Sequence, residues 1–263
     1  MSNGVTAPRL YAFQAGGDLA DLACYDPFDP NVGTKVFEPW FSYVIRHQQG
    51  NVLFDTGIHP DMTKDPRARL GEWADLIEMK VEEGEDIVSR LASIDLTPED
   101  ISIVVLSHMH FDHVDALNLF THARIVVQRA EYAFAQRPAV YQAGTYLQSH
   151  FAGQYNWDLI DGPLDLFGDG VIELIPSPGH SPGHQSMLVS LTGDKLLLMA
   201  DATYQLDKME QRLLPAVVWS PDAMVASWAL LEWLAKREGA EMHCSHDLEF
   251  RSRVRLAPEA WYE

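Results

Sequence analysis

Residues 108–113 read His-Met-His-Phe-Asp-His, so three imidazoles and one carboxylate fall within six positions. The apolar run 101–106 ends just before them and is typical of a strand buried on both faces. Alternate residues at a strand end point the same way, so His108 and His110 can bind one cation while Asp112 and His113 face a neighbouring one. Imidazole with carboxylate suits zinc, iron, cobalt or manganese, and the lack of a nearby thiolate disfavours a closed structural zinc site.

Three further candidate ligands follow predicted strands later in the chain. His180 lies in Ser-Pro-Gly-His-Ser-Pro-Gly-His at 177–184, Asp201 follows the apolar run 196–199, and His246 follows the run 241–244. Because all three come at strand ends, a sheet architecture can bring them to the first cluster.

The remaining patterns predict an α/β fold. Strands are expected at 41–46 and 51–55, which read as a hairpin, and at 125–127, 171–175, 186–191 and 195–199. Helix and loop are expected over 59–94, a helix over 129–136, and a helix from an N-cap at Ser220 to Gly239. No repeat or linker divides the chain, so one domain over 1–263 is expected, with helices on the outer faces of sheets.

Composition excludes several classes of partner. Asp and Glu number 38 against 19 Lys and Arg, a net charge of −19 that repels nucleic acid and anionic membranes. No stretch reaches the ~18 apolar residues of a membrane span, and Met1–Pro8 lacks the features of a signal peptide. Two cysteines, Cys24 and Cys244, cannot form a disulfide framework. A cytoplasmic protein with a small-molecule substrate is expected, and a homodimer stays open.

The order His-x-His-x-Asp-His, then His, Asp and His, resembles the metallo-β-lactamase superfamily over nearly the full chain. The resemblance implies a four-layer αβ/βα sandwich with two divalent metal ions, Zn²⁺ first, and iron, cobalt or manganese as alternatives. It assigns one metal to His108, His110 and His180, the other to Asp112, His113 and His246, and the bridging position to Asp201.

Three nearby residues take supporting roles in this interpretation. The family ligand is the first histidine of Pro-Gly-His-x-x-Gly-His, which favours His180 over His184 and gives His184 a supporting role. Asp55, in Asp-Thr-Gly at 55–57, matches a position that supports the metal loop. Cys244 is expected to be buried two residues before His246, where a redox effect on the site is conceivable.

Within the superfamily the sequence is most similar to the N-acyl homoserine lactonases. Tyr204, three residues after Asp201, matches their catalytic tyrosine, and Phe111 lies inside the first motif as in that family. Several lactonases continue with Gly-Gly-Asn where this chain has Val-Asp-Ala-Leu-Asn at 114–118, so a different pocket wall is expected. The resemblance implies opening of the lactone ring of acyl homoserine lactones, which are quorum-sensing signals, by a hydroxide bound to two metals, with Tyr204 and Asp112 as catalytic residues.

Other functions on the same fold stay open. The nearest alternatives are hydrolysis of a pyridoxine-degradation lactone, of another ester, or of a thioester as in glyoxalase II. A β-lactamase is less expected without a signal peptide, and an iron oxygenase would not need the second set Asp112, His113 and His246. The intact ligand set disfavours a non-catalytic scaffold. Six side chains are candidates for either core packing or an acyl-chain groove: Trp40, Phe41, Met62, Trp73, Met79 and Trp219.

Overall fold

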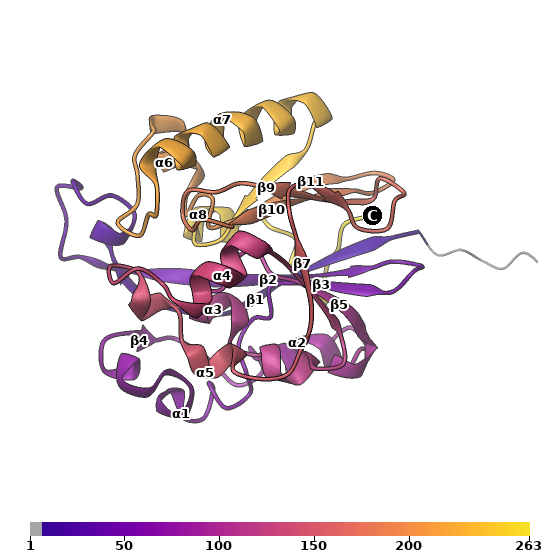
Figure 1. Cartoon of the computed structure of the whole chain (residues 1–263), viewed down its shortest axis with the longest axis horizontal. Coiled ribbons are helices and arrows are strands. Elements are labelled where there is room, and N and C mark those ends of the chain that lie inside the picture. The colour runs from indigo at the N-terminus through magenta and orange to yellow at the C-terminus, as the bar shows by residue number, and fades with distance from the viewer. Residues whose placement is uncertain (1–6) are drawn as a thin grey trace, which may run out of the picture.

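Two β-sheets packed face to face form the centre of the computed structural model, which describes residues 7–263 (Figure 1). The expectation that Met1–Pro8 holds no signal peptide falls largely outside the described residues. None of the helices within 7–263 has the length and apolar character needed to cross a membrane.

The larger sheet has seven strands in the order β4-β1-β2-β3-β5-β6-β7. Its strands are β1 (Arg9–Asp21), β2 (Lys35–Arg46), β3 (Asn51–Phe54), β4 (Glu78–Met79), β5 (Ile101–Val105), β6 (Arg124–Gln128) and β7 (Asn156–Ile160). Strands β3, β5, β6 and β7 run parallel, so their carboxyl ends lie at one edge. Asp55 and the 108–113 loop both leave the sheet at this edge.

The smaller sheet has five strands in the order β12-β11-β10-β9-β8. Its strands are β8 (Leu164–Asp165), β9 (Ile172–Pro176), β10 (Gln185–Ser190), β11 (Lys195–Ala200) and β12 (Glu241–Cys244). Since β10 is antiparallel to both β9 and β11, and β12 is parallel to β11, strands β9, β11 and β12 share one direction. The segments that follow them carry His180, Asp201 and His246, which are therefore brought to the same edge.

Helices cover the outer faces of both sheets (Figure 1). Helix α7 (Pro221–Glu238) packs on β11, and α2 (Ile87–Ala92) packs against β1. The other α-helices are short: α1 (Pro66–Leu70), α3 (Phe111–Val114), α4 (Arg129–Gln136), α5 (Gln148–Phe151), α6 (Leu206–Gln211) and α8 (Leu248–Arg251). The 3-10 turns are Leu22–Cys24, Gly71–Asp75, Pro98–Asp100, Leu117–Phe120 and Ala143–Thr145. The predicted αβ/βα sandwich is confirmed.

Local sequence accounts for the limits of α7. Ser220 accepts a hydrogen bond from the Ala223 backbone N–H, and Pro221 occupies the first helical position. Gly239 ends the helix with φ of 65°, a left-handed conformation that glycine adopts without a steric penalty. The predicted start and end are both confirmed.

The core lies on both sides of the larger sheet. Val105 points between the sheets and packs in the cluster that contains Leu174 and Leu197, whereas Val104 points to the outer face and packs in the cluster that contains Leu91. This alternation explains why 101–106 reads as a continuous apolar run: each face of β5 is buried.

Several elements differ from the sequence-based expectation. The hairpin at 41–55 and the helix at 129–136 are confirmed, but β2 begins earlier, at Lys35, and the helix-and-loop region 59–94 includes the short strand β4. Strands β1, β7 and β8 were not predicted. In β1 the run Ala-Gly-Gly-Asp at 15–18 has low strand propensity, and pairing with β2 along most of its length compensates.

Candidate metal centre

The 108–113 motif forms a loop and one turn of helix at the sheet edge. His108 lies three residues beyond β5, and His110 is the N-cap of α3, which contains Asp112 and His113. The expected reason for their convergence, alternation along a strand, is therefore wrong, because none of these residues is in the strand. Instead, the chain reverses direction at His110, and this turn separates His108 and His110 from Asp112 and His113.

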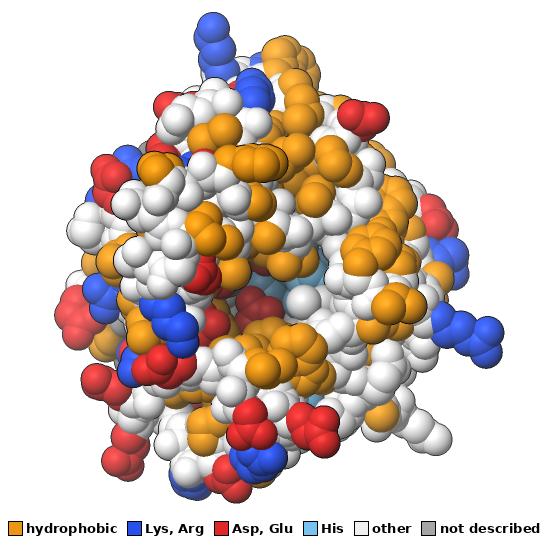
Figure 2. All heavy atoms as spheres, turned by 90° about the vertical axis from the view of Figure 1, so that its left-hand side faces the viewer, with side chains coloured by type: hydrophobic (Ala, Val, Ile, Leu, Met, Phe, Trp, Pro, Cys, Tyr) orange, Lys and Arg blue, Asp and Glu red, His pale blue; other side chains and the backbone are white. Residues whose placement is uncertain are grey.

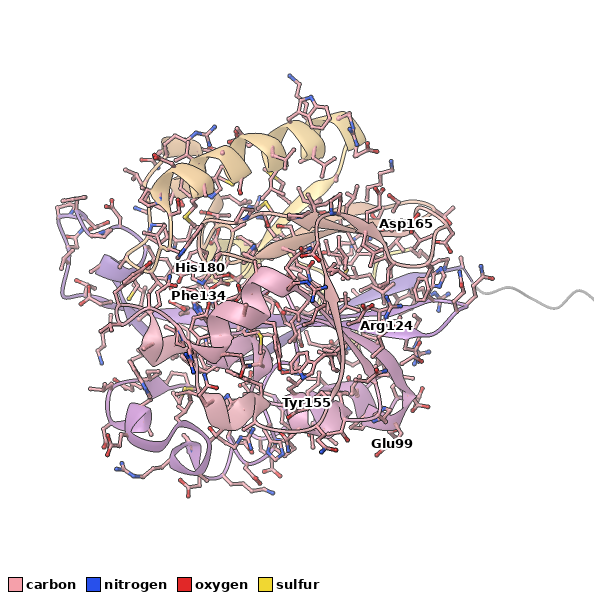
Figure 3. The ribbon with its side chains drawn as sticks, in the orientation of Figure 1. Glu99, Arg124, Phe134, Tyr155, Asp165 and His180 are labelled. Carbon is pink, nitrogen blue, oxygen red and sulfur yellow. The ribbon has the colours of Figure 1, made fainter. Side chains whose placement is uncertain are left out.

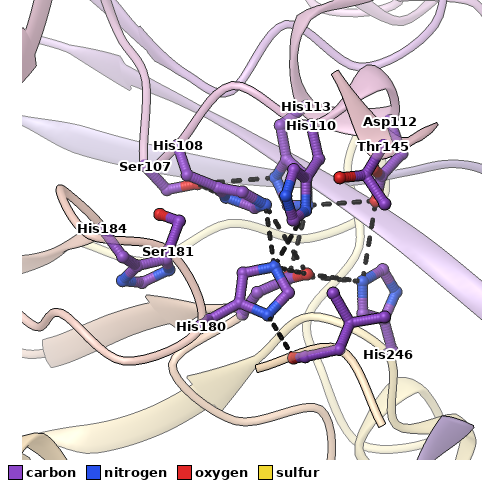
Figure 4. Close-up of polar contacts among 12 residues, drawn as sticks. Ser107, His108, His110, Asp112, His113, Thr145, His180, Ser181, His184 and His246 are labelled. Carbon is purple, nitrogen blue, oxygen red and sulfur yellow. Dashed lines mark hydrogen bonds and ion pairs between the residues drawn. The ribbon is translucent and has the colours of Figure 1, made fainter. Parts of the chain in front are cut away.

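Four residues converge to form what we call group one: His108, His110, His180 and Asp201. His180 Nε2 lies 3.2 Å from His108 Nε2 and 2.9 Å from His110 Nδ1, as Figure 4 shows. Asp201 Oδ2 lies 3.3 Å from His180 Nε2. Three imidazole nitrogens thus point at one small volume.

Group two consists of Asp112, His113, Asp201 and His246. Asp201 Oδ1 lies 3.1 Å from His113 Nε2 and 3.2 Å from His246 Nε2. Asp112 Oδ2 lies 3.1 Å from His113 Nε2 and 3.6 Å from His246 Nε2. Asp201 Oδ1 faces group two, and Oδ2 lies 3.3 Å both from His180 Nε2 of group one and from His246 Nε2 of group two. The carboxylate therefore stands between the two groups, where it can be shared by two cations.

The donor atoms of both groups fit divalent metal ions. Ligands bound at ~2.1 Å in a tetrahedron stand about 3.4 Å apart, close to the separations found here. His113 Nε2 and Asp201 Oδ1 are buried and, although only 3.1 Å apart, meet the angular requirements of a hydrogen bond neither with each other nor with another described residue. A buried polar atom without a partner is costly, and a cation between these atoms would satisfy both.

The electrostatics of the two groups differ. Burial and the neighbouring imidazoles hold the pKa of His108 and of His110 well below the ordinary value, so these rings are neutral and ready to bind a cation. In group two burial opposes protonation, yet the surrounding carboxylates raise the pKa of His113 well above its ordinary value. The pKa of His246 is raised to about 10, against the effect of burial, by Glu38 and Asp201. In group two the two carboxylates are thus balanced by two protonated imidazoles, and cation binding would release the imidazole protons.

Acceptors outside the groups fix four of the five imidazole rings. His113 Nδ1 lies 2.8 Å from Asp55 Oδ2, and His108 Nδ1 lies 3.0 Å from Ser107 Oγ. The other two partners are backbone carbonyls, at 3.1 Å from Nδ1 in each case: Val217 for His180 and Pro39 for His246. Such contacts select the ring tautomer and aim the other nitrogen inward.

Asp55 occupies the supporting position expected for it. Its carboxylate accepts hydrogen bonds from the Ser107 backbone N–H at 2.7 Å and from Ser107 Oγ at 2.8 Å, besides its contact with His113. Its φ of 58° is unusual for a residue other than glycine, and so is the 44° of Ala200 next to Asp201. Strained backbone at these two points turns the chain toward the site.

The 177–184 loop owes its shape to two glycines. A Cβ at Gly183 would lie 2.1 Å from the Glu131 backbone nitrogen, and one at Gly179, where φ is 148°, would lie 2.3 Å from the Met224 Cα. This loop places His180 in group one. His184 stands outside both groups (Figure 4), and its Nδ1 lies 2.9 Å from Ser177 Oγ.

Glu131 is a buried carboxylate that contacts both the 108–113 loop and the 177–184 loop. It accepts hydrogen bonds from the Met109 and Gly183 backbone N–H groups and from the hydroxyls of Ser181 and Tyr146, at 2.6 to 3.1 Å. Sequence reasoning missed it, because a glutamate in the first turn of a short helix such as α4 is typically exposed.

We expect Glu131→Ala to lower the free energy of unfolding of the metal-free protein by about 3 kcal/mol or more, since each buried donor left unpaired costs ~1 to 3 kcal/mol. Denaturant unfolding in the presence of a chelator measures this loss. Glu131→Gln, which keeps one acceptor oxygen, should lose less. A Glu131→Ala protein as stable as the wild type would contradict the role given to this carboxylate.

A cavity of about 370 Å³ opens onto the two groups, and His110, Asp112, Asp201 and His246 contribute to its wall. Figure 2 shows a hollow in which histidine and acidic side chains are visible, ringed by hydrophobic ones. Figure 3 places His180 toward one end of the sandwich, away from Arg124 at the amino end of β6. The site thus occupies the carboxyl-terminal edge of the strands.

Tyr204 lines this cavity beside both groups. Its ring centroid lies 5.0 Å from that of His246 and 5.6 Å from that of His180. Burial, with the nearby Asp201 and Glu38 carboxylates, holds the pKa of Tyr204 well above its ordinary value. The hydroxyl therefore stays protonated and can donate a hydrogen bond into the cavity.

The candidate groove residues separate into different places. Of the six candidates, Trp40 and Trp73 line the cavity, whereas Phe41 and Met62 are in the core. Met79 and Trp219 are not part of the cavity wall. Both cysteines are free thiols, and burial raises the pKa of Cys244 well above its ordinary value, which keeps that thiol protonated and poorly reactive.

The chain matches known proteins along most of its length. The model of the Metallo-beta-lactamase superfamily matches residues 38–240. N-acyl homoserine lactonase AttM of Azorhizobium caulinodans is 34% identical over 98% of this chain and 96% of its own. An N-acyl homoserine lactonase of Bacillus cereus is 28% identical over 97% of this chain and 99% of its own.

Solved structures of N-acyl homoserine lactonases are also similar to this chain along most of its length. One similar structure is an N-acyl homoserine lactone hydrolase with the product N-hexanoyl-L-homoserine bound at its catalytic metal centre. Its TM-score with this chain is 0.85 at 27% identity, and the match covers 97% of this chain and 99% of that one. A mutant of AiiA of Bacillus thuringiensis with N-decanoyl-L-homoserine at its active site gives 0.85 at 26% identity, with the same coverage. The chain therefore belongs to the metallo-beta-lactamase superfamily and, within it, to the family of the N-acyl homoserine lactonases.

Proposed function

We propose that this protein hydrolyses the lactone ring of N-acyl homoserine lactones. The observation that carries the proposal is the pair of metal-binding groups sharing Asp201 at the wall of a cavity that also holds Tyr204. Relatives named for this activity match over the full chain, and two similar structures hold acyl homoserine products at the corresponding centre.

The proposal assigns His108, His110 and His180 to one cation, Asp112, His113 and His246 to the other, and Asp201 to both. Zn²⁺ is the proposed metal, because imidazole and carboxylate donors at these spacings suit it. Cations held there supply a nucleophile from water near neutral pH and polarise the ester carbonyl.

The chain's own groups then act on the reacting atoms. Tyr204 donates its hydroxyl hydrogen to the lactone carbonyl oxygen, where negative charge develops as the ring opens. Asp112 lines the cavity and contacts His113 and His246 through Oδ2, so its carboxylate can carry the proton to the departing alkoxide oxygen. No covalent bond to the protein is needed in this scheme.

The cavity wall suits an acyl chain. Leu19, Trp40, Trp73, Ile77 and Phe111 contribute apolar surface next to the polar end formed by the two groups. Apolar side chains around a few placed polar groups are typical of small-molecule sites. An acyl homoserine lactone has the same division, with a polar lactone and amide at one end and an alkyl chain at the other.

The test is a pH-indicator assay on protein whose metal content is counted by elemental analysis. We expect turnover of acyl homoserine lactones of several chain lengths, with two metals per chain, and much weaker turnover of S-lactoylglutathione, pyridoxolactone and nitrocefin. Two bound metals without turnover of any acyl homoserine lactone would overturn the substrate and leave the ester or thioester hydrolases as the alternative.

A further inference from the structure

One wall of the cavity is a segment with little core of its own. Residues 59–80 include α1 and β4 and place Trp73, Leu76 and Ile77 at the cavity. The segment packs on a small cluster apart from the two main ones, with Trp40, Ile58, Met62 and Leu70 as its buried members. Leu76 is 73% exposed. Segments with few buried apolar contacts open easily, so another contact must hold this wall in place.

A buried ion pair supplies that contact. Arg69 Nε lies 2.8 Å from Asp115 Oδ1, and the Asp115 side chain is 0% exposed. Asp115 Oδ2 accepts a hydrogen bond from the His59 backbone N–H at 2.7 Å. The guanidinium of Arg69 also donates to the Asp115 carbonyl. One carboxylate therefore fastens both the start of the segment and α1.

His150 on α5 joins the same network. Its Nε2 lies 3.0 Å from the Arg69 carbonyl oxygen and 3.4 Å from Asp115 Oδ1. Burial lowers the pKa of His150, so the neutral ring offers one N–H to the pair of oxygens. Both Asp115 carboxylate oxygens and the Arg69 carbonyl thus have a donor nearby, which helps such a buried pair to hold its geometry.

The network connects the cavity wall to the metal-binding loop. Asp115 directly follows α3, which carries Asp112 and His113. It is also the second residue of the 114–118 stretch, where this chain departs from the Gly-Gly-Asn of several lactonases. The departure from the family pattern therefore coincides with an ion pair that reaches across to the cavity wall.

We propose that the Asp115–Arg69 pair is a positioning clamp that holds segment 59–80 against the cavity and so sets how tightly the distal part of an acyl chain is bound. The inference rests on the proposed function. Breaking the pair leaves the Asp115 charge buried without its partner, and the segment moves away to let water in. Neither Arg69 nor any cavity residue of segment 59–80 belongs to the two groups, so the chemical step is unaffected when Arg69 is replaced.

The test compares Arg69→Gln with Arg67→Gln, a matched control on the same helix whose ion pair with Asp75 lies at the surface. N-decanoyl and N-butyryl homoserine lactone serve as substrates. We expect Arg69→Gln to raise KM for the decanoyl substrate roughly tenfold, about what losing contact with two methylene groups costs. The decanoyl kcat, the butyryl KM and the metal content should stay unchanged, and Arg67→Gln should behave as the wild type.

Limited trypsin digestion gives a readout that needs no substrate. Lys64 and Lys80 are exposed within the segment, and cleavage there should be faster in Arg69→Gln than in Arg67→Gln. If the single variant does not fold, the double variant Arg69→Met with Asp115→Leu removes the unpaired charge as well and should show the same rise in decanoyl KM.

Three outcomes would overturn the clamp: equal changes for both chain lengths, loss of metal from Arg69→Gln, or unchanged cleavage at Lys64 and Lys80. A wild-type protein that hydrolyses neither substrate would instead refute the proposed function. The digestion experiment still decides the clamp in that case, so the two failures are distinguishable.

Discussion

Replacing Asp201 by asparagine should remove both metal ions and reduce lactone hydrolysis by ~10⁴-fold or more, since the nucleophile and the polarised carbonyl both depend on bound cations. The Asp201 carboxylate stands between the two groups, with Oδ2 3.3 Å from His180 Nε2 and Oδ1 3.1 Å from His113 Nε2. An amide keeps the size of the side chain but loses the negative charge and one acceptor. Elemental analysis after dialysis and the pH-indicator assay measure the two effects.

His184→Gln is the control for this experiment. His184 is a fully buried histidine close to the site, with its ring centroid 5.3 Å from that of His108, yet it belongs to neither group. We expect the His184→Gln protein to keep two metals per chain. Retention of both metals by Asp201→Asn would show that this carboxylate does not bridge, and loss of metal from His184→Gln would move the ligand set to His184.

The sequence predicts the positions of the candidate ligands because they follow strand ends. Strands β5 and β11 are largely apolar runs, and β9 and β12 are short segments in which apolar and polar residues mix. Each is followed by histidine or aspartate, the residue types that bind metal ions. The parallel directions of β9, β11 and β12 then bring His180, Asp201 and His246 together. The positions of these three residues after strands, together with the shared strand direction, account for this part of the site from the sequence.

The supporting residues could not be predicted in the same way. Glu131 is in the third position of an eight-residue helix, and its burial depends on contacts with distant segments such as the 177–184 loop. Arg69 and Asp115 are 46 positions apart, and neither has a neighbour in the sequence that indicates the other. Propensity and spacing describe local structure, whereas these contacts depend on how distant loops meet.

Glu38 shows the same limit at the metal centre. It is opposite Asp18 in the β1–β2 pairing, and its Oε1 lies 3.3 Å from His246 Nδ1. In the sequence it is one glutamate in a strand whose start was not predicted. Its contact with His246 depends on the register between β1 and β2 and on where β12 ends. No local sequence pattern relates these distant segments to one another.

Tyr204→Phe should lower kcat for acyl homoserine lactones by ~10² to 10³-fold while both metals stay bound, because a well-placed donor to a developing oxyanion is worth that much. Tyr204 lines the cavity next to His246 and His180 and touches neither group as a ligand. Phenylalanine keeps the ring and removes only the hydroxyl, so the fold and the metal content should not change. Steady-state kinetics with metal analysis of the same sample measure the effect.

Tyr25→Phe is the matched control, and it separates catalysis from packing. Tyr25 stands edge-on to Tyr204 with ring centroids 5.9 Å apart and is only 2% exposed, so both substitutions delete one hydroxyl from the same aromatic cluster. Tyr25 is not part of the cavity wall. We therefore expect Tyr25→Phe to keep the wild-type kcat. If Tyr204→Phe also keeps it, Tyr204 is a packing residue, and the carbonyl oxygen is stabilised by the cations alone.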